Sequence, residues 1–373
     1  MRNTKKWMAG MLTAVLLMTA GCGASSQGTT TQTTTTSTEQ GVTTSDSETT
    51  IFTDSIGRKV ELPKTITKIA PSGNLAQMIL YSLAPDKMIG WSSDPGESMS
   101  AYFPDEYKNL PIFGTFYGKK ADLNKEALIA AEPQVIIDMG EIKDDMATDL
   151  DNLQEQLGIP VIFIEAQLEN SGTAYRTLGT LLDMEEEAET LATYCDNTIQ
   201  DAKEKAATIA EEDKITVYYG EGEDGLSANP KGTFHTEVID LVGAVNIADI
   251  PDAGKGENQI TLEQMLLWDP DVLLFTPDGA YESIGTDDSW SDLKAVQTKH
   301  FYEIPSIPYN WIDRPPAVNR IIGVKWLGNL LYPDVFDYDM VKEAQEFYKL
   351  FYRYDLSEQE AKDFMSKSTF ANS

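Results

Sequence analysis

The sequence is poor in the residues on which most catalytic and metal sites depend. Its 373 residues include only two histidines and two cysteines. It contains no Gly-x-Ser-x-Gly elbow, no phosphate-binding glycine-rich loop and no His-Glu-x-x-His zinc motif. Because covalent and acid–base catalysis need activated groups of these kinds, their absence argues against a hydrolase or transferase. An enzyme built on carboxylates alone stays open, since Asp and Glu number 60.

Positive charge is also scarce. Lys and Arg together number 29, which leaves a formal net charge of −31 at pH 7. A surface this acidic argues against nucleic acid and against anionic membranes as partners. It is compatible with docking onto a basic patch of another protein.

The first 21 residues have the pattern of a targeting segment. A basic start is followed by an apolar run over 7–20, which is too short to span a membrane comfortably. The run ends just before Cys22, and the whole resembles a bacterial lipoprotein signal, which implies that Cys22 becomes the lipidated first residue. An ordinary secretory signal with a free cysteine is the alternative. The expectation is export and retention on the outer face of the bacterial cytoplasmic membrane.

Residues 22–50 begin with this cysteine and continue as a stretch dominated by Thr, Ser, Gln and Gly. Such a composition cannot bury apolar area, so we expect a disordered tether. Beyond Cys22 only Cys195 remains, which excludes a disulfide within the mature chain and a cysteine metal site.

A long amphipathic helix is predicted over 184–210, near the middle of the chain. Apolar residues recur there at steps of three and four, no Gly or Pro interrupts the pattern, and glutamates crowd its first turns. A coiled coil is excluded because no second heptad stretch exists to pair with it. The apolar positions are Met184, Ala188, Leu191, Cys195, Ile199, Ala202, Ala206 and Ile209.

The segments before and after this helix follow one scheme. Residues 126–137 and 263–274 each read Glu, six residues, Pro, one polar residue, Val and two aliphatics. Each is typical of a short helix, a proline stop and a buried strand. Strands and helices alternate on both sides, which predicts an α/β fold with parallel-type sheets. We therefore expect two Rossmann-like lobes, 51–183 and 212–373, joined by a connecting helix over 184–211.

These features together resemble the substrate-binding lipoproteins of ABC importers, in the class that serves ferric siderophores, haem and vitamin B12. The resemblance covers 51–365 and rests on the lipoprotein start, the opening Asp54-Ser-Ile-Gly-Arg-Lys-Val60, the strand–turn–helix at 69–83, the paired motifs and the long helix. It implies two lobes joined by one rigid helix, a ligand cleft between them, and binding without catalysis. It also implies an ABC permease and its ATPase as partners, no intrinsic cofactor and a monomer.

Candidate ligand contacts in the first lobe follow strand ends, where parallel sheets bind their ligands. Ser72 and Asn74 stand at a helix start and could hold an anionic group, or serve only as helix caps. Trp91 ends a strand and is either a flat platform for the ligand or a core residue. Tyr117 lies where this family often presents a ligand-contacting residue, and it could stack on a macrocycle or ligate iron.

The richest candidate segment in the second lobe is 308–316, in which two aromatic residues, an amide, a carboxylate and an arginine are followed by two prolines. Loops of this kind on a rigid scaffold tend to be functional. The predicted contacts are Tyr309, Asn310, Trp311 and Arg314, although an intralobe salt bridge would also explain the arginine. His235 is either a metal ligand or a residue of a helix start.

Two carboxylates are candidates for permease docking, by analogy with the family. They are Glu141, after the strand at 135, and Glu237, in a helix expected over 234–242; solvated surface charge is the alternative for both. The mature chain has few arginines, which disfavours a dense trianion such as a tris-catecholate. The expected ligand is an iron–siderophore or corrinoid complex; haem, a molybdate or tungstate oxyanion, and a sensor role without import stay open.

Overall fold

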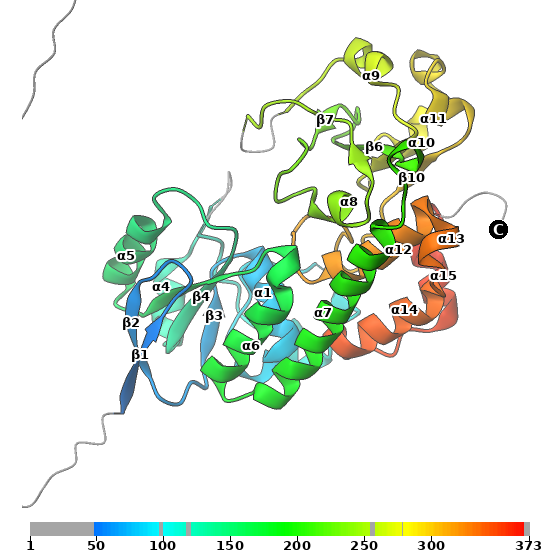
Figure 1. Ribbon diagram of the computed structural model, residues 1–373. Coiled ribbons are helices and arrows are strands. Elements are labelled where there is room, and N and C mark those ends of the chain that lie inside the picture. The colour runs from blue at the N-terminus through cyan, green and yellow to red at the C-terminus, as the bar shows by residue number, and fades with distance from the viewer. Residues whose placement is uncertain (1–47, 97–99, 117–120, 254–257, 278, 369–373) are drawn as a thin grey trace, which may run out of the picture. The chain divides into compact units, whose positions relative to one another are not determined.

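The protein is described here as a computed structural model that covers residues 48–96, 100–116, 121–253, 258–277 and 279–368 (Figure 1). The chain divides into two units, Met1–Asp46 and Ser47–Ser373, and all the described residues lie in the second. The signal segment, Cys22 and nearly all of the predicted tether are therefore outside the described residues. The lobe boundaries proposed from the sequence stay a prediction.

The first half of the chain forms a small parallel sheet. Strands β3 (Ile69–Pro71), β4 (Val135–Gly140) and β5 (Val161–Glu165) lie in the order β3-β4-β5, and both pairings are parallel. A separate antiparallel hairpin, β1 (Thr49–Thr53) and β2 (Lys59–Pro63), precedes them. The α-helices of this half are α1 (Asn74–Leu83), α3 (Asp105–Lys108), α4 (Lys125–Ala131), α5 (Met146–Leu157) and α6 (Ser171–Leu182).

The second half forms its own sheet, in the order β10-β9-β6-β7. Strands β10 (Phe301–Glu303), β9 (Val272–Phe275) and β6 (Thr216–Glu221) pair in parallel, and β8 (Val245–Asn246) also pairs in parallel with β6. Strand β7 (Ser227–Ala228) pairs antiparallel with β6. The prediction of an α/β fold with parallel sheets is confirmed. Short helices α8 (Glu237–Leu241), α9 (Leu262–Trp268), α10 (Tyr281–Ile284) and α11 (Lys294–Gln297) lie between these strands in sequence.

The long amphipathic helix is α7 (Glu185–Ala206), which lies in sequence between the two sheets. Five of its predicted apolar positions are buried, and three glutamates occupy its first turn, where the helix dipole favours negative charge. It ends four residues before the predicted 210, in a short series of turn hydrogen bonds that ends at Ile209. Helix α6 packs along it, with α1 beside them (Figure 1).

The helix expected over 234–242 is shorter than predicted. Helix α8 contains only Glu237–Leu241, because the buried Thr236 turns the chain just before it. The Thr236 N–H donates to the carbonyl oxygen of Thr233, and its hydroxyl donates to the carbonyl oxygens of Thr233 and Pro230. Residues that the sequence assigned to a helix thus lie in a turn, and this frees Phe234 and His235 to project toward a pocket.

The carboxyl-terminal segment packs against both halves of the chain. It contains α12 (Asn319–Leu331), α13 (Pro333–Phe336), α14 (Met340–Phe347), a π-helical turn over Tyr348–Tyr352 and α15 (Glu358–Phe364). The Tyr81 hydroxyl of α1 donates to the carbonyl oxygen of Tyr352, and Arg353 donates back to the carbonyl of Tyr81. One buried apolar cluster includes residues of both sheets, such as Ile137 and Leu274, together with α7 and α12.

Candidate functional site

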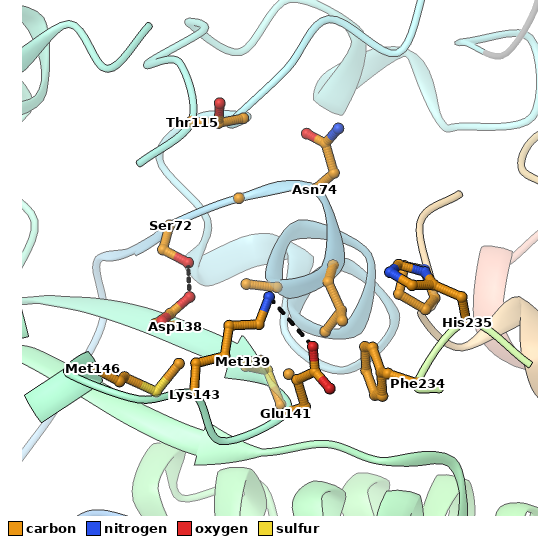
Figure 2. Close-up of a pocket in the computed structure, with 15 residues that line it drawn as sticks. Ser72, Asn74, Thr115, Asp138, Met139, Glu141, Lys143, Met146, Phe234 and His235 are labelled. Atoms are coloured by element: carbon orange, nitrogen blue, oxygen red, sulfur yellow. Dashed lines mark hydrogen bonds and ion pairs between the residues drawn. The ribbon is translucent and has the colours of Figure 1, made fainter. Parts of the chain in front are cut away.

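The main pocket has a volume of ≈ 510 Å³ and is lined by segments from both halves of the chain (Figure 2). One wall is the turn from β3 into α1, and the floor is the end of β4 with the residues after it. Phe234, His235 and Pro316 form the opposite wall. The first wall and the floor lie at the carboxyl ends of the parallel strands β3 and β4, where such sheets place their ligands. The lining residues of the first wall, the floor and their surroundings are Ser72–Ala76, Thr115, Asp138, Met139, Gly140, Glu141, Lys143 and Met146.

The first wall presents the start of α1. Gly73 is the residue before the helix, so no side chain caps it, and the first-turn N–H groups have no side-chain acceptor. Asn74 is exposed at the pocket, and its Oδ1 accepts a hydrogen bond of 3.3 Å from Ser92. Ser72 is buried and its hydroxyl donates to Asp138, so this hydroxyl is already engaged within the protein.

Asp138 lies at the floor of the pocket, near the end of β4, and is only 4% exposed. Its Oδ1 accepts the Ser72 hydrogen bond, while its Oδ2 is buried without a hydrogen-bond partner. Burial raises the pKa of Asp138 to about 6, although the bonds from Ser72 and the Met139 backbone and the charge of Lys143 act in the opposite direction. This carboxyl group therefore changes charge close to neutral pH.

Two further charged side chains face the pocket beyond β4. Glu141 and Lys143 approach to 3.3 Å and are both at least partly exposed, so their attraction contributes little to stability (Figure 2). Gly140 allows the chain to leave the strand here, because its φ of 148° is a conformation that side chains disfavour.

His235 is held in place by a carboxylate behind it. Its Nδ1 lies 2.9 and 3.0 Å from the two carboxylate oxygens of Asp313, which is fully buried. A carboxylate can only accept here, so Nδ1 carries the hydrogen and the neutral imidazole has its lone pair on Nε2. Within the described part of the chain, Nε2 has no hydrogen-bond partner, and His235 lines the main pocket.

A second pocket of ≈ 380 Å³ lies at the carboxyl ends of β6, β9 and β10. We call it the Arg314 pocket; it is lined by Glu221, Gly222, Thr276, Pro277, Ser306, Tyr309, Asn310 and Arg314. Arg314 donates two hydrogen bonds of 2.8 Å to Glu221 and lies 3.5 Å from Asp313. Burial acts to lower the pKa of Arg314, but attraction to the two carboxylates outweighs it, so the guanidinium is charged and already neutralised. In this conformation Arg314 therefore forms the intralobe salt bridge that the sequence analysis gave as the alternative to a ligand contact.

Asn310 and Tyr309, which also line the Arg314 pocket, make hydrogen bonds within the protein. The Asn310 amide oxygen accepts from the N–H groups of Ile312 and Asp313, whereas its Nδ2 is buried without a partner. The Tyr309 hydroxyl accepts a 3.3 Å bond from Gln77 of α1, and burial raises the pKa of Tyr309 to about 12. Tyr309 therefore stays a neutral phenol at physiological pH.

The structure places both predicted tryptophan contacts in the core. Trp91 is 1% exposed, and its indole N–H donates to the carbonyl oxygen of Tyr107. Trp311 is fully buried against Trp326 and points its indole N–H at Tyr348. Neither ring offers a face to a ligand in this conformation, which corrects the prediction that they do.

The other predicted residues differ in where the structure places them. Glu237 accepts from the buried guanidinium of Arg320 and from the Leu168 backbone N–H, so it is engaged internally rather than free for docking. Glu141 lies at the pocket. Tyr117 and Cys22 are outside the described residues. No cluster of three or more His, Cys, Asp and Glu side chains suited to a metal ion occurs in the described ranges.

Sequence reasoning did not identify Asp138, Phe234 or the role of Asp313. Asp138 carried a usable signal, because an acid that follows three buried aliphatics at a strand end faces the ligand edge of a parallel sheet. Asp313 lies in the candidate segment 308–316 but was not among the predicted contacts. Its contact with His235 joins residues 78 positions apart and has no local signature.

Comparison with known proteins gives the class. Residues 96–308 match the family described as periplasmic binding protein, so the chain belongs to that family. It is a substrate-binding protein of ABC importers, in the class that serves ferric siderophores, haem and vitamin B12. The family consists of non-enzymatic binding proteins for small solutes outside the cytoplasm, which confirms the prediction that this protein is not an enzyme.

Particular relatives cover most of the chain. It is 25% identical over 333 residues to the molybdate-binding protein MolA of Haemophilus influenzae, covering 81% of this chain and 91% of that protein. It is 24% identical over 340 residues to YvrC of Bacillus subtilis, an uncharacterized ABC transporter substrate-binding lipoprotein, covering 88% and 97%.

Among solved structures, an ABC transporter solute-binding protein from Sulfurospirillum deleyianum is 29% identical, with a TM-score of 0.78. The match covers 85% of this chain and 99% of that one. The solved structures that resemble this chain have a two-lobed α/β fold. In the described residues, no helix combines the length and apolar character needed to cross a membrane.

Proposed function

We propose that this protein captures a metal complex of the iron–siderophore or corrinoid type in the main pocket and delivers it to an ABC permease. Lipidation at Cys22 would hold it on the outer face of the cytoplasmic membrane, and the polar stretch to residue 50 would act as its tether. Similarity to a lipoprotein of Bacillus subtilis supports the anchor. Capture would require no intrinsic cofactor, because the metal arrives with its ligand.

The observation that carries this proposal is the His235–Asp313 pair. A histidine whose Nδ1 is fixed by a buried carboxylate presents Nε2 in a set direction, which is how proteins orient imidazole ligands of metals. The described residues hold no complete protein ligand set. A metal that arrives with most of its positions filled by a chelator or macrocycle needs only one more donor, and His235 supplies one.

The other lining residues suit a ligand of that kind. Leu75, Ala76, Met139, Met146 and Phe234 give the pocket apolar walls, and ≈ 510 Å³ lies in the range of pockets for drug-sized molecules. Asp138 and Glu141 face the same space, and both oppose a compact dianion such as molybdate. Arg320, whose guanidinium lies 4.5 Å from the centroid of the Phe234 ring, is paired with Glu237. Arg314 is neutralised by Glu221 and Asp313.

A second candidate, a molybdate-type oxyanion, has one observation in its favour. The start of α1, which no side chain caps, lines the pocket, and such helix starts bind anions. A relative that covers most of the chain is named as a molybdate-binding protein. The two candidates differ in their need for His235, since an oxyanion has no vacant coordination position for an imidazole.

The connecting role of α7 belongs to the same proposal. One apolar cluster contains residues of α7, of both sheets and of the carboxyl-terminal helices, so wide opening would expose apolar area. We infer that α7 acts as a stiff link between two lobes and that closure on the ligand is small. Glu141, at the rim of the pocket, remains the candidate for permease docking on the first lobe, whereas the pairing of Glu237 with Arg320 disfavours the other.

The test is a titration of the purified chain with haemin, a ferric tris-hydroxamate, a ferric bis-hydroxamate, cobalamin and molybdate. We expect a complex with an open metal position to bind and to show an imidazole-dependent change in its visible absorption. His235→Ala should abolish that change and weaken binding. His300→Ala, at the only other histidine, is the matched control. Equal binding and identical spectra for wild type and His235→Ala would refute metal ligation, and saturable binding of molybdate alone would favour the second candidate.

A further inference from the structure

Asp138 is a buried acid in the main pocket, and the proposed function treats it only as a negative charge that opposes a compact dianion. It belongs to the central strand of its sheet, with β3 on one side and β5 on the other. Its Oδ1 accepts from Ser72, and its Oδ2 is buried with no hydrogen-bond partner. A carboxylate left half satisfied in this way is costly to ionise, so its charge depends closely on what surrounds it.

The surroundings offer little compensation. From β3 and the start of α1 come Ser72 and Asn74, and from β5 comes the apolar Phe163, which is its register partner. Helix α5 contributes Met146. Across the pocket stand Phe234 and His235, and the titratable groups beyond β4 are Glu141 and Lys143. Among the described lining residues Lys143 is the one lysine or arginine, and it is partly exposed and paired with Glu141.

A ligand that fills the pocket would displace water from above Asp138 and strengthen its electrostatic influence. An anionic ligand would then lie over an ionised carboxylate whose one neighbouring lysine, Lys143, is already paired with Glu141. Protonation removes that repulsion, and the raised pKa of Asp138 places this step close to neutral pH. An uncharged ligand has no such penalty.

We propose that Asp138 selects the ligand by charge, so that an anionic complex binds together with one proton on Asp138 while an uncharged complex binds independently of it. The proton comes from solvent and adds to the carboxylate, and no bond of the ligand is broken. This inference rests on the proposed function, because it requires the main pocket to be the binding site. It assigns to the floor of that pocket a selectivity that depends on pH.

The experiment compares affinities from about pH 5 to about pH 8 for three anions and two uncharged complexes. The anions are molybdate, ferric citrate and haemin, of which haemin keeps an open metal position for His235. The uncharged complexes, cyanocobalamin and a ferric tris-hydroxamate, have filled metal positions and report on charge alone. The proteins are wild type, Asp138→Asn, Ser72→Ala and the exposed control Asp292→Asn. Asp138→Asn preserves the shape of the side chain and removes its charge. Proton uptake by the ligand itself cancels when variant and wild type are compared at the same pH.

We expect the wild-type affinity for an anion to fall by up to about tenfold per pH unit above the midpoint, and that of Asp138→Asn to lack this component. Ser72→Ala removes a hydrogen bond that favours the ionised form, so its midpoint should move to higher pH. Affinity for uncharged complexes should be the same at every pH. Identical pH profiles for wild type and Asp138→Asn would overturn this inference alone, whereas failure of all probes to bind at any pH would overturn the proposed function and this inference with it.

Discussion

The charge of Asp138 should make the stability of the protein depend on pH even without a ligand. Burial raises its pKa in the folded state from 3.8 to about 6. A carboxyl group whose pKa is raised on folding stabilises the folded state only while it is protonated. The pH dependence is therefore the reverse of that of an acid whose pKa is lowered on folding. The contribution of Asp138 to the stability of the folded state is complete below about pH 4 and is lost as pH rises through about 6.

The magnitude follows from the size of the shift. About two pKa units correspond to about 3 kcal/mol between the protonated and ionised limits. The side chain of Asp138→Asn cannot ionise, so the variant lacks this pH dependence. We therefore compare the free energy of unfolding of the wild type with that of the variant, and expect their difference, wild type minus variant, to fall by about 3 kcal/mol between about pH 4 and about pH 7.5. The amide Nδ2 occupies the position of Oδ2, where no partner exists, and this adds a penalty of about 1–3 kcal/mol that is the same at every pH.

The assay is urea unfolding at a series of pH values, followed by both tryptophan fluorescence and circular dichroism, so that coincident transitions establish a single step. Asp292→Asn, at an exposed position, is the control and should show a difference that does not depend on pH. A difference between wild type and Asp138→Asn that stays constant from about pH 4 to about pH 7.5 would refute the reasoning. It would mean that the carboxyl group has the same pKa in the folded and unfolded states.

Three further predictions concern residues whose roles changed once the structure was known. Asp313→Asn should weaken binding of a metal complex about 10- to 100-fold by loosening His235, measured by absorption titration; unchanged affinity would remove Asp313 from the site. Glu237→Gln should destabilise the fold by about 3 kcal/mol because it leaves the buried Arg320 without its charged partner, and urea unfolding with no loss of stability would contradict this. Trp311→Ala should cost about 3–5 kcal/mol as a core truncation, and any folded fraction should keep its ligand affinity, measured by calorimetry; a loss of affinity with normal stability would restore Trp311 as a ligand contact.

Local patterns were enough to predict the secondary structure that positions the site. The three-and-four spacing of apolar residues predicted α7, and the aliphatic runs after Pro133 and Pro270 predicted β4 and β9. These patterns are reliable because each is set by neighbours within a turn or two along the chain. The start of α8 was wrong by three residues, because the bonds of Thr236 to Pro230 and Thr233 hold the preceding segment in a turn.

The sequence by itself determined an α/β protein with two parallel sheets, the order of its elements and the strand ends at which the pockets lie. Only the tertiary structure decided which side chains at those ends face the pocket. Asn310, Trp311 and Asp313 lie within four positions of one another, yet the tryptophan enters the core, while the acid turns toward His235, 78 residues away. Composition cannot separate these outcomes, because burial and pairing depend on which distant segments the fold brings together.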